Sequence, residues 1–133
     1  MYDVLLCVDA DGTGLDRLIA AVTALPAAAE SVHVTVCHVF GDNPSGASAT
    51  QVTSVRRALD ALDDADIEAS VVGESGDPTD AILRVADEHD ADTIYIGGRK
   101  RSPAGKALFG SVAQSLILSA DRPVQITGSG PGA

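Results

Sequence analysis

Apolar residues along the chain follow two alternating patterns, one typical of buried strands and the other typical of helices. Runs that are largely apolar predict strands at residues 4–8, 32–40, 68–72, 92–96 and 123–127. Strands that lack a polar face are typical of a parallel sheet that is covered on both sides. The intervening segments repeat their apolar residues every three or four positions, which predicts amphipathic helices.

The predicted helices have recognisable ends as well as inward faces. Asp77 followed by Pro78 is a strong helix start, because aspartate caps the first free N–H groups and proline fits the first helical position. Another helix is predicted from Gly110 through Ser119. The residues expected to face the core in the other three helices are Leu15, Leu18, Ile19, Val22 and Leu25; Val52, Val55, Leu59 and Leu62; and Ile82, Val85, Ala86 and His89.

The alternation of strands and helices implies right-handed crossovers. We therefore predict an α/β fold, a single open five-stranded parallel sheet with helices on both faces. We expect one domain over residues 1–128 and a flexible tail over residues 129–133. Ligands of such sheets bind at the carboxyl ends of the strands, where the strand order reverses. If the first and fourth strands flank this point, Asp9 and Gly97 mark the site.

The charge composition narrows the classes of partner. A formal net charge of −10 on 133 residues repels nucleic acid and anionic membranes, so we expect neither as a partner. No apolar run reaches the ~20 residues of a membrane span, and the amino-terminal segment is typical of a strand rather than a signal peptide. We expect a cytoplasmic protein. Fifteen of the 19 acidic residues are Asp and only two basic residues are Lys, which favours adaptation to concentrated salt.

The cysteines and histidines do not form a recognisable catalytic or metal motif. Cys7 and Cys37 both fall inside predicted buried strands, which indicates core thiols. The three histidines lack the spacing of metal ligands, and no Ser, His and Asp set predicts a hydrolytic triad. His38 is notable because it lies next to the end of a predicted strand.

The positive charge of this acidic chain is concentrated in one glycine-rich segment. Arg99, Lys100, Arg101 and Lys106 are four of the nine basic residues, and they follow the predicted fourth strand. The segment ends at Gly110, where the last helix begins. Strand, glycine-rich loop and helix N-terminus together favour phosphate binding, because free N–H groups and the helix dipole attract anions. A solvated basic turn is the alternative interpretation.

Several segments together resemble the universal stress protein family over the whole chain. They are DVLLCVDADGTG, VCHVF, GDPTDAIL, ADTIYIGG and GSVAQSLILSADRPVQI. The family's ATP loop is a glycine, two residues, a second glycine, nine residues, and then Gly-Ser or Gly-Thr. Gly97, Gly110 and Ser111 match this loop at the correct spacing, whereas Lys100 takes the place of the second glycine.

This resemblance implies an adenine nucleotide alpha hydrolase-like, Rossmann-like sheet with strand order 3-2-1-4-5 and an ATP site, with or without Mg²⁺. The loop residues would surround the phosphates, and the backbone around Val39 would meet the adenine. Asp9 would reach the nucleoside. Because its carboxylate repels phosphate, we expect Asp9 to face a ribose hydroxyl, the adenine edge or a bound Mg²⁺. The site residues expected to bind nucleotide are Asp9, Val39, Gly97, Arg99, Lys100, Gly110 and Ser111.

The substitution at Lys100 has two opposite readings. If the missing glycine needs a positive φ, lysine strains the loop by ~1–2 kcal/mol and closes the pocket. If the local backbone is permissive, the lysine ammonium adds a phosphate ligand beside Arg99. We expect nucleotide binding to be retained, because the neighbouring cations otherwise have no evident use.

The resemblance also implies a homodimer that pairs through the last strand, from Pro123 to Thr127. Val124 and Ile126 alternate on this short edge strand, and an unpaired edge invites antiparallel pairing. The expected function is a dimeric, ATP-binding sensor or regulator of the stress response. The alternatives are a nucleotide-free interaction module of the same fold and a slow ATPase. No residue is designated as catalytic, and Asp9 acting through magnesium is the only candidate.

Overall fold

The computed structural model describes residues 1–10, 12, 14–40, 48–97 and 110–128. Its five strands form one sheet in the order β3-β2-β1-β4-β5, and every neighbouring pair is parallel. The predicted fold class and strand order are therefore confirmed. The strands are β1 (Tyr2–Cys7), β2 (Val32–Phe40), β3 (Glu68–Ser75), β4 (Thr93–Gly97) and β5 (Val124–Thr127).

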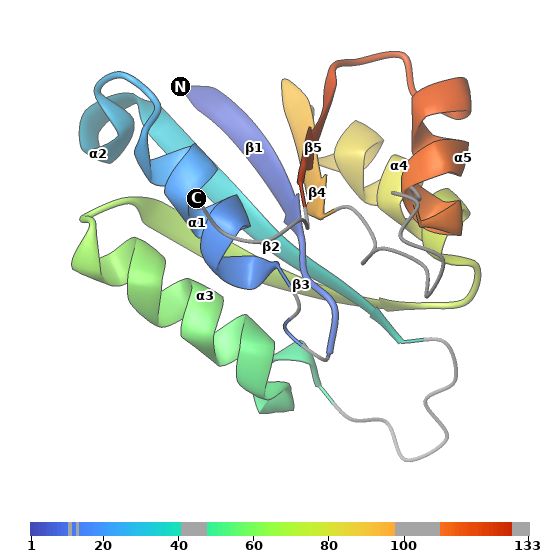
Figure 1. Ribbon diagram of the computed structural model, residues 1–133, viewed down its shortest axis with the longest axis horizontal. Helices are drawn as coiled ribbons and strands as arrows, with labels where there is room; N and C mark the ends of the chain where they lie inside the picture. Colours follow the sequence, from blue (N-terminus) through green and yellow to red (C-terminus); the bar gives the residue numbers. More distant parts are fainter. Residues whose placement is uncertain (11, 13, 41–47, 98–109, 129–133) are drawn as a thin grey trace.

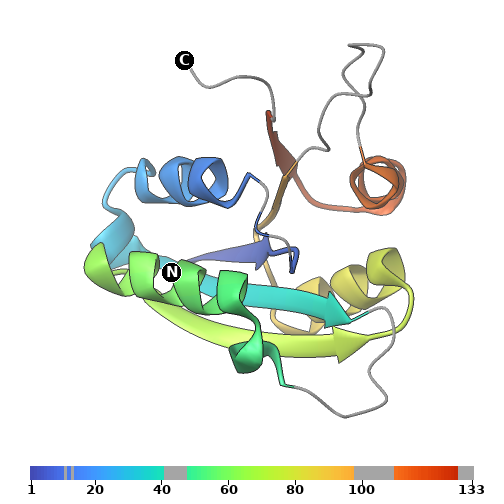
Figure 2. The same cartoon turned by 60° about the horizontal axis from the view of Figure 1, so that its bottom comes forward.

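Helices cover both faces of this sheet, so the fold has three layers (Figure 1). α1 and α3 lie on one face, while α4 and α5 lie on the other, and the turned view in Figure 2 shows the same division. No helix in the described part of the chain is long and apolar enough to cross a membrane. The helices are α1 (Leu15–Thr23), α2 (Ala28–Ser31), α3 (Thr53–Asp64), α4 (Pro78–Glu88) and α5 (Ser111–Ser119), with a 3₁₀ turn η1 (Ala49–Gln51).

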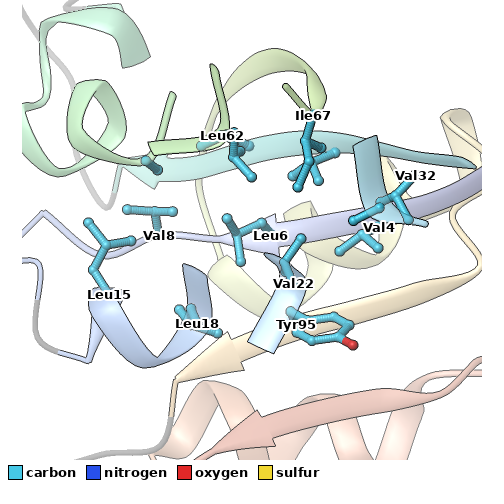
Figure 3. Close-up of a cluster of buried hydrophobic side chains, with 14 of the residues drawn as sticks. Val4, Leu6, Val8, Leu15, Leu18, Val22, Val32, Leu62, Ile67 and Tyr95 are labelled. Atoms are coloured by element: carbon cyan, nitrogen blue, oxygen red, sulfur yellow. The ribbon is translucent and has the colours of Figure 1, made fainter. Parts of the chain in front are cut away.

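The two faces of β1 belong to two separate apolar clusters. Val4, Leu6 and Val8 pack with α1 and α3 in the first cluster, which Figure 3 shows. Leu5 and Cys7 pack with α4 and α5 in the second cluster. Because successive side chains of a strand point to opposite faces, the buried part of β1, from Val4 to Cys7, must be apolar at every position. This two-sided burial explains the continuous apolar run in the sequence.

The amino-terminal end of α4 agrees with its sequence signal, whereas its carboxyl-terminal end does not. The Asp77 side chain accepts a hydrogen bond of 3.0 Å from the Asp80 N–H, so Asp77 is the predicted cap. His89 was expected on the inner face of the helix, but it is exposed and follows the last helical residue. Asp90, with φ 50°, then takes the left-handed conformation and turns the chain away from the helix.

Strand lengths also differ from the pattern-based prediction. β3 was expected to end at Val72, yet its pairing with β2 continues as far as Ser75. Gly73 interrupts the apolar pattern of this half-buried edge strand but not its ladder of hydrogen bonds. At the other end of the sheet, Asp92 precedes β4, and its N–H donates to the Asp3 oxygen at 2.8 Å. The short helix α2 was not predicted, because four residues are too few to show a helical period.

Candidate functional site

The carboxyl ends of β1 and β4 lie next to each other at the point where the strand order reverses. Leu5 of β1 is paired with Ile94 of β4 in parallel register, so both strands run to the same edge of the sheet. Gly97 is the last residue of β4. Asp9 lies two residues beyond the end of β1 and has an exposed side chain. The structure thus brings Asp9 and Gly97 to one edge, at the topological position where doubly wound sheets bind ligands.

Half-buried apolar residues from three elements border this edge on the face covered by α4 and α5. Val39 is the penultimate residue of β2, Ile96 comes from β4, and Val112 comes from the first turn of α5. All three side chains are only partly buried, and they pack against the apolar cluster that contains Cys7. An apolar margin of this kind suits a flat aromatic ring. Ile96 and Val112 were not singled out in the sequence, although the strand alternation of Ile94 and Ile96 is a usable signal.

The N-terminus of α5 lies on the same face of the sheet. Gly110 is its N-cap residue, with φ −63° and ψ 154°, and as a glycine it provides no side-chain cap for the first N–H groups of the helix. Ser111, the first helical residue, is exposed, and the first turn carries no acidic side chain. Uncapped N–H groups and the positive end of the helix dipole favour an anion at this position. The φ of Gly110 suits any residue, so glycine is not required here for backbone freedom.

Two of the expected phosphate ligands lie outside the described residues. Arg99 and Lys100 belong to the segment 98–109, and their roles remain predictions. The described site therefore consists of Asp9, Val39, Gly97, Gly110 and Ser111, together with the apolar margin. Among the described residues, no group of three or more His, Cys, Asp or Glu side chains could hold a metal ion.

Two side chains hold the main chain where β1 leaves the sheet. The His38 imidazole Nδ1 lies 2.7 Å from the Val8 oxygen, and it must donate because a carbonyl can only accept. The Ser54 hydroxyl donates to the Asp9 oxygen at 2.5 Å. His38 was notable in the sequence because it lies next to the end of a predicted strand. The role of Ser54 depends on a contact across 45 residues and has no sequence signal.

The two cysteines lie directly opposite each other on β1 and β2, close to the candidate site. Both thiols are free and buried. Burial, with smaller contributions from Cys37 and Asp9, raises the pKa of the Cys7 thiol well above its usual value. Burial and the charge of Glu74 raise the pKa of Cys37 to about 12. Both thiols are therefore neutral at physiological pH, as the interpretation of inert core thiols requires.

At the opposite end of the sheet, Asp3, His33 and Ser70 form a line across three neighbouring strands. The His33 Nδ1 lies 3.4 Å from an Asp3 carboxylate oxygen, and its Nε2 lies 3.4 Å from the Ser70 hydroxyl. No hydrolytic triad was expected, and this line of contacts between residues that are distant in the chain has no sequence signal. Both contacts are at the long end of the hydrogen-bonding range, and Ser70 is exposed on the sheet. We therefore assign the line to surface hydrogen bonding and not to catalysis.

The topology and the position of this edge define a doubly wound α/β protein with an anion-favouring helix terminus at its switch point. The chain belongs to the universal stress protein family, whose model matches residues 1–127. A universal stress protein of Mycolicibacterium smegmatis is 48% identical over 48 residues. That match spans 36% of this chain and 37% of the relative, so it covers only about a third of either protein.

Solved structures of the family share the whole fold. A universal stress protein from Archaeoglobus fulgidus superposes with a TM-score of 0.76 at 29% identity, covering 95% of this chain and 98% of that chain. A structure of the universal stress protein from the same organism, in complex with dAMP, has a TM-score of 0.70 at 25% identity. It covers 95% of this chain and 97% of the other.

Proposed function

We propose that this protein binds an adenine nucleotide at the edge formed by β1, β4 and the N-terminus of α5. The observation that carries the proposal is the N-terminus of α5, whose N-cap residue Gly110 offers no side-chain cap and which lies on the same face as the half-buried Val39 and Ile96. An anion-favouring helix end beside an apolar margin suits a ligand with a phosphate at one end and an aromatic ring at the other. The relative that was solved with dAMP supports this ligand class.

The described residues fit the parts of such a nucleotide. Gly110, which has no side chain, would let a phosphate approach the first N–H groups of α5, and the Ser111 hydroxyl would add a donor there. Val39 and its backbone would meet the adenine. The exposed Asp9 carboxylate would face a ribose hydroxyl, the adenine edge or a Mg²⁺ ion held jointly with the phosphates. Arg99 and Lys100 would supply positive charge, which favours ATP over AMP.

Calorimetric titration of the purified protein with ATP and AMP tests the proposal. The titration should be done in molar KCl, with and without Mg²⁺, because the composition favours adaptation to concentrated salt. Exposed charges are screened within ~3 Å at this salt concentration, so binding must depend on close contacts. We expect saturable binding that is tighter for ATP. The variant Ser111→Ala should weaken it about tenfold, the effect of one lost hydrogen bond to a charged group. Ser119→Ala, the same change at the other end of α5, is the matched control.

Absence of saturable binding to any adenine nucleotide would contradict the proposal. The same fold would then act as a nucleotide-free interaction module. Equal affinities of the Ser111→Ala and Ser119→Ala variants, both weaker or both unchanged, would place the phosphates elsewhere on the molecule.

We further propose that two copies pair through the edge strand β5 and that the dimer acts as a sensor or regulator. Among the described strands, β5 has a neighbour on one side only, so its other edge is free to pair with a second copy. The helix that packs against it, α5, exposes two large apolar side chains, Ile117 and Leu118. The roles assigned to the site residues are all binding roles, which suits a protein that senses nucleotide.

A further inference from the structure

Consecutive carbonyl groups at the end of β1 are each held by a buried side chain from a distant part of the sequence. His38 of β2 donates to the Val8 oxygen at 2.7 Å, and Ser54 of α3 donates to the Asp9 oxygen at 2.5 Å. His38 is 7% exposed and Ser54 is 2% exposed. Buried polar side chains that bond to the main chain fix its path, because breaking the bond would leave an unpaired group in the core.

The His38 ring has little freedom to turn away from this bond. The edge of the neighbouring Phe40 ring packs against it, with the ring centroids 4.6 Å apart and the planes at 88°. Phe40 in turn lies close to Gly73, where an added Cβ atom would be in ordinary van der Waals contact with the ring at 3.5 Å. The packing of the two rings favours the orientation in which Nδ1 donates to the Val8 carbonyl.

The Asp9 carbonyl is part of a chain of hydrogen bonds that leads into α1. It accepts from the Ser54 hydroxyl and also from the Gly12 N–H at 3.2 Å. The Gly12 oxygen accepts from the N–H of Leu15, the first residue of α1. Gly12 has φ 70°, a left-handed conformation that favours glycine. These hydrogen bonds connect Asp9, Gly12 and the first residue of α1, and the Ser54 hydroxyl joins them to α3.

His38 and Ser54 hold the main chain from the face of the sheet that α1 and α3 cover, whereas the proposed nucleotide site lies on the face of α4 and α5. Val8 packs in the cluster of α1 and α3, whereas Cys7 packs in the cluster of α4 and α5. The charge of the exposed Asp9 carboxylate helps to raise the pKa of the Cys7 thiol, which belongs to the cluster of α4 and α5. The Asp9 main chain is held by Ser54 of α3, on the other face.

We propose that His38 and Ser54 are positioning residues, which fix the main chain at Val8 and Asp9 so that the Asp9 carboxylate stays at the nucleotide edge. This inference rests on the proposed function. The Asp9 carboxylate is exposed, and phosphates that bind beside it would repel it. A main chain held by His38 and Ser54 would keep it at a ribose hydroxyl or a Mg²⁺ ion.

The experiment compares substitutions that keep or lose each donor. Asn at position 38 places an amide nitrogen at the same distance along the side chain as the imidazole Nδ1, whereas Gln places it one bond further out. We expect His38→Asn to retain ATP affinity within about threefold, and His38→Gln to lose about tenfold, the equivalent of one hydrogen bond. Ser54→Ala should lose a similar factor.

A matched control separates positioning from general destabilisation. Thr93 is also buried, and its hydroxyl donates to the backbone oxygen of Pro123. It begins β4, at the end of the strand away from Gly97 and the candidate site. Thr93→Val should lower thermal stability about as much as Ser54→Ala, yet leave ATP affinity unchanged. If it weakens ATP binding as much as Ser54→Ala does, or if the Asn and Gln variants bind alike, the inference is overturned.

Amide hydrogen exchange without nucleotide tests the anchors independently of binding. The Gly12 N–H should exchange faster in Ser54→Ala than in the wild type or Thr93→Val, because its acceptor is no longer held. If the wild type binds no adenine nucleotide, the proposed function fails, whereas the exchange rates still decide whether Ser54 fixes this turn. Unchanged exchange at Gly12 would overturn the inference even if ATP binds.

Discussion

The guanidinium group of Arg122 donates a hydrogen bond of 2.8 Å to the backbone oxygen of Ala86, near the end of α4. The same nitrogen lies 2.8 Å from the Ala91 oxygen, and other atoms of the group contact Asp87 and Asp121. The last carbonyls of a helix have no partner within the helix. The Ala86 oxygen also accepts from the Ala91 N–H at 2.9 Å, and Arg122 adds a second donor that ties the segment before β5 to the end of α4.

We predict that Arg122→Ala lowers the free energy of unfolding by about 2–4 kcal/mol, because charge-assisted bonds to half-buried carbonyls contribute about 1.5–3 kcal/mol each and are not additive. The exposed carboxylates of Asp87 and Asp121 add little. Urea denaturation measures the change.

Arg84→Ala is the control for that variant. Arg84 is 49% exposed and pairs with Glu74 at 3.5 Å on the surface. Its replacement should change stability by less than about 1 kcal/mol. Equal losses in the two variants would mean that the bonds from Arg122 to the α4 carbonyls do not stabilise the fold.

The buried thiols make stability depend on alkaline pH. The folded protein raises the pKa of Cys37 to about 12, and it raises the pKa of Cys7 as well, whereas an unfolded thiol titrates near ~8.5. Their contribution to stability is fully present below pH ~8.5 and is lost as pH rises toward the folded pKa values. The loss approaches ~1.4 kcal/mol per pH unit for each thiol.

Urea denaturation of the wild type and of a Cys7→Val, Cys37→Val double variant between pH 7 and pH 11 measures this loss. The wild type should lose stability more steeply above pH 9. The raised pKa of Tyr95, caused by burial and by Tyr2, acts equally in both proteins and cancels in the difference. Parallel pH profiles would show that the thiols ionise freely in the folded state.

The proposed dimer can be tested at the exposed apolar side chains of α5. Leu118 is 79% exposed and Ile117 is 49% exposed on the helix that packs against the edge strand β5. If a second copy covers them, Leu118→Asp should convert the dimer to a monomer, because a buried unpaired carboxylate is costly. Light scattering after size exclusion distinguishes the 13.5 kDa monomer from a species of twice that mass.

Gln114→Asp adds the same charge to another exposed position of α5 and should leave the dimer intact. A wild type that is monomeric at all concentrations would contradict the pairing. So would a Leu118→Asp variant that remains dimeric.

The central strands could be predicted from the sequence because burial on two faces leaves an unambiguous pattern, whereas the strand order was implied by the family resemblance. Leu5 and Leu6 are both fully buried, on opposite faces of the sheet, and only an apolar run satisfies both environments. The start of α4 could be predicted because Asp77 and Pro78 act locally. Its end could not, because the apolar period continues to His89 although Asp90 turns the chain in a left-handed conformation.

The residues of the candidate site likewise fall into two groups, those that a local motif predicts and those that only the folded chain brings together. Gly97, Gly110 and Ser111 belong to a local motif with fixed spacing, so the sequence is sufficient to select them. The anchors on Val8 and Asp9 come from His38 and Ser54, and such contacts depend on how β2 and α3 pack against β1. Only the folded chain shows them. The line of Asp3, His33 and Ser70 is long-range in the same sense.

The N-cap position of α5 offers a test in which stability and binding should respond in opposite ways. Gly110 has the extended conformation that N-cap residues adopt, yet its helix lacks a side-chain cap. The N-cap of α4, by contrast, is filled by Asp77, whose carboxylate accepts from the Asp80 N–H. A carboxylate at position 110 would bond to the same first-turn N–H groups that we assign to phosphate.

We therefore expect Gly110→Asp to keep or raise the free energy of unfolding by a few tenths of a kcal/mol, since aspartate caps a helix slightly better than glycine. The same variant should weaken ATP binding by more than about tenfold, because the new charge repels phosphate and occupies its donors. Gly110→Ala adds a side chain without a charge or an acceptor, so it should weaken binding less and should not stabilise the helix. Urea denaturation and calorimetry on the three proteins measure both quantities. If Gly110→Asp binds ATP as tightly as the wild type, the phosphates do not contact the N-terminus of α5, and the anion-favouring end of this helix serves another purpose.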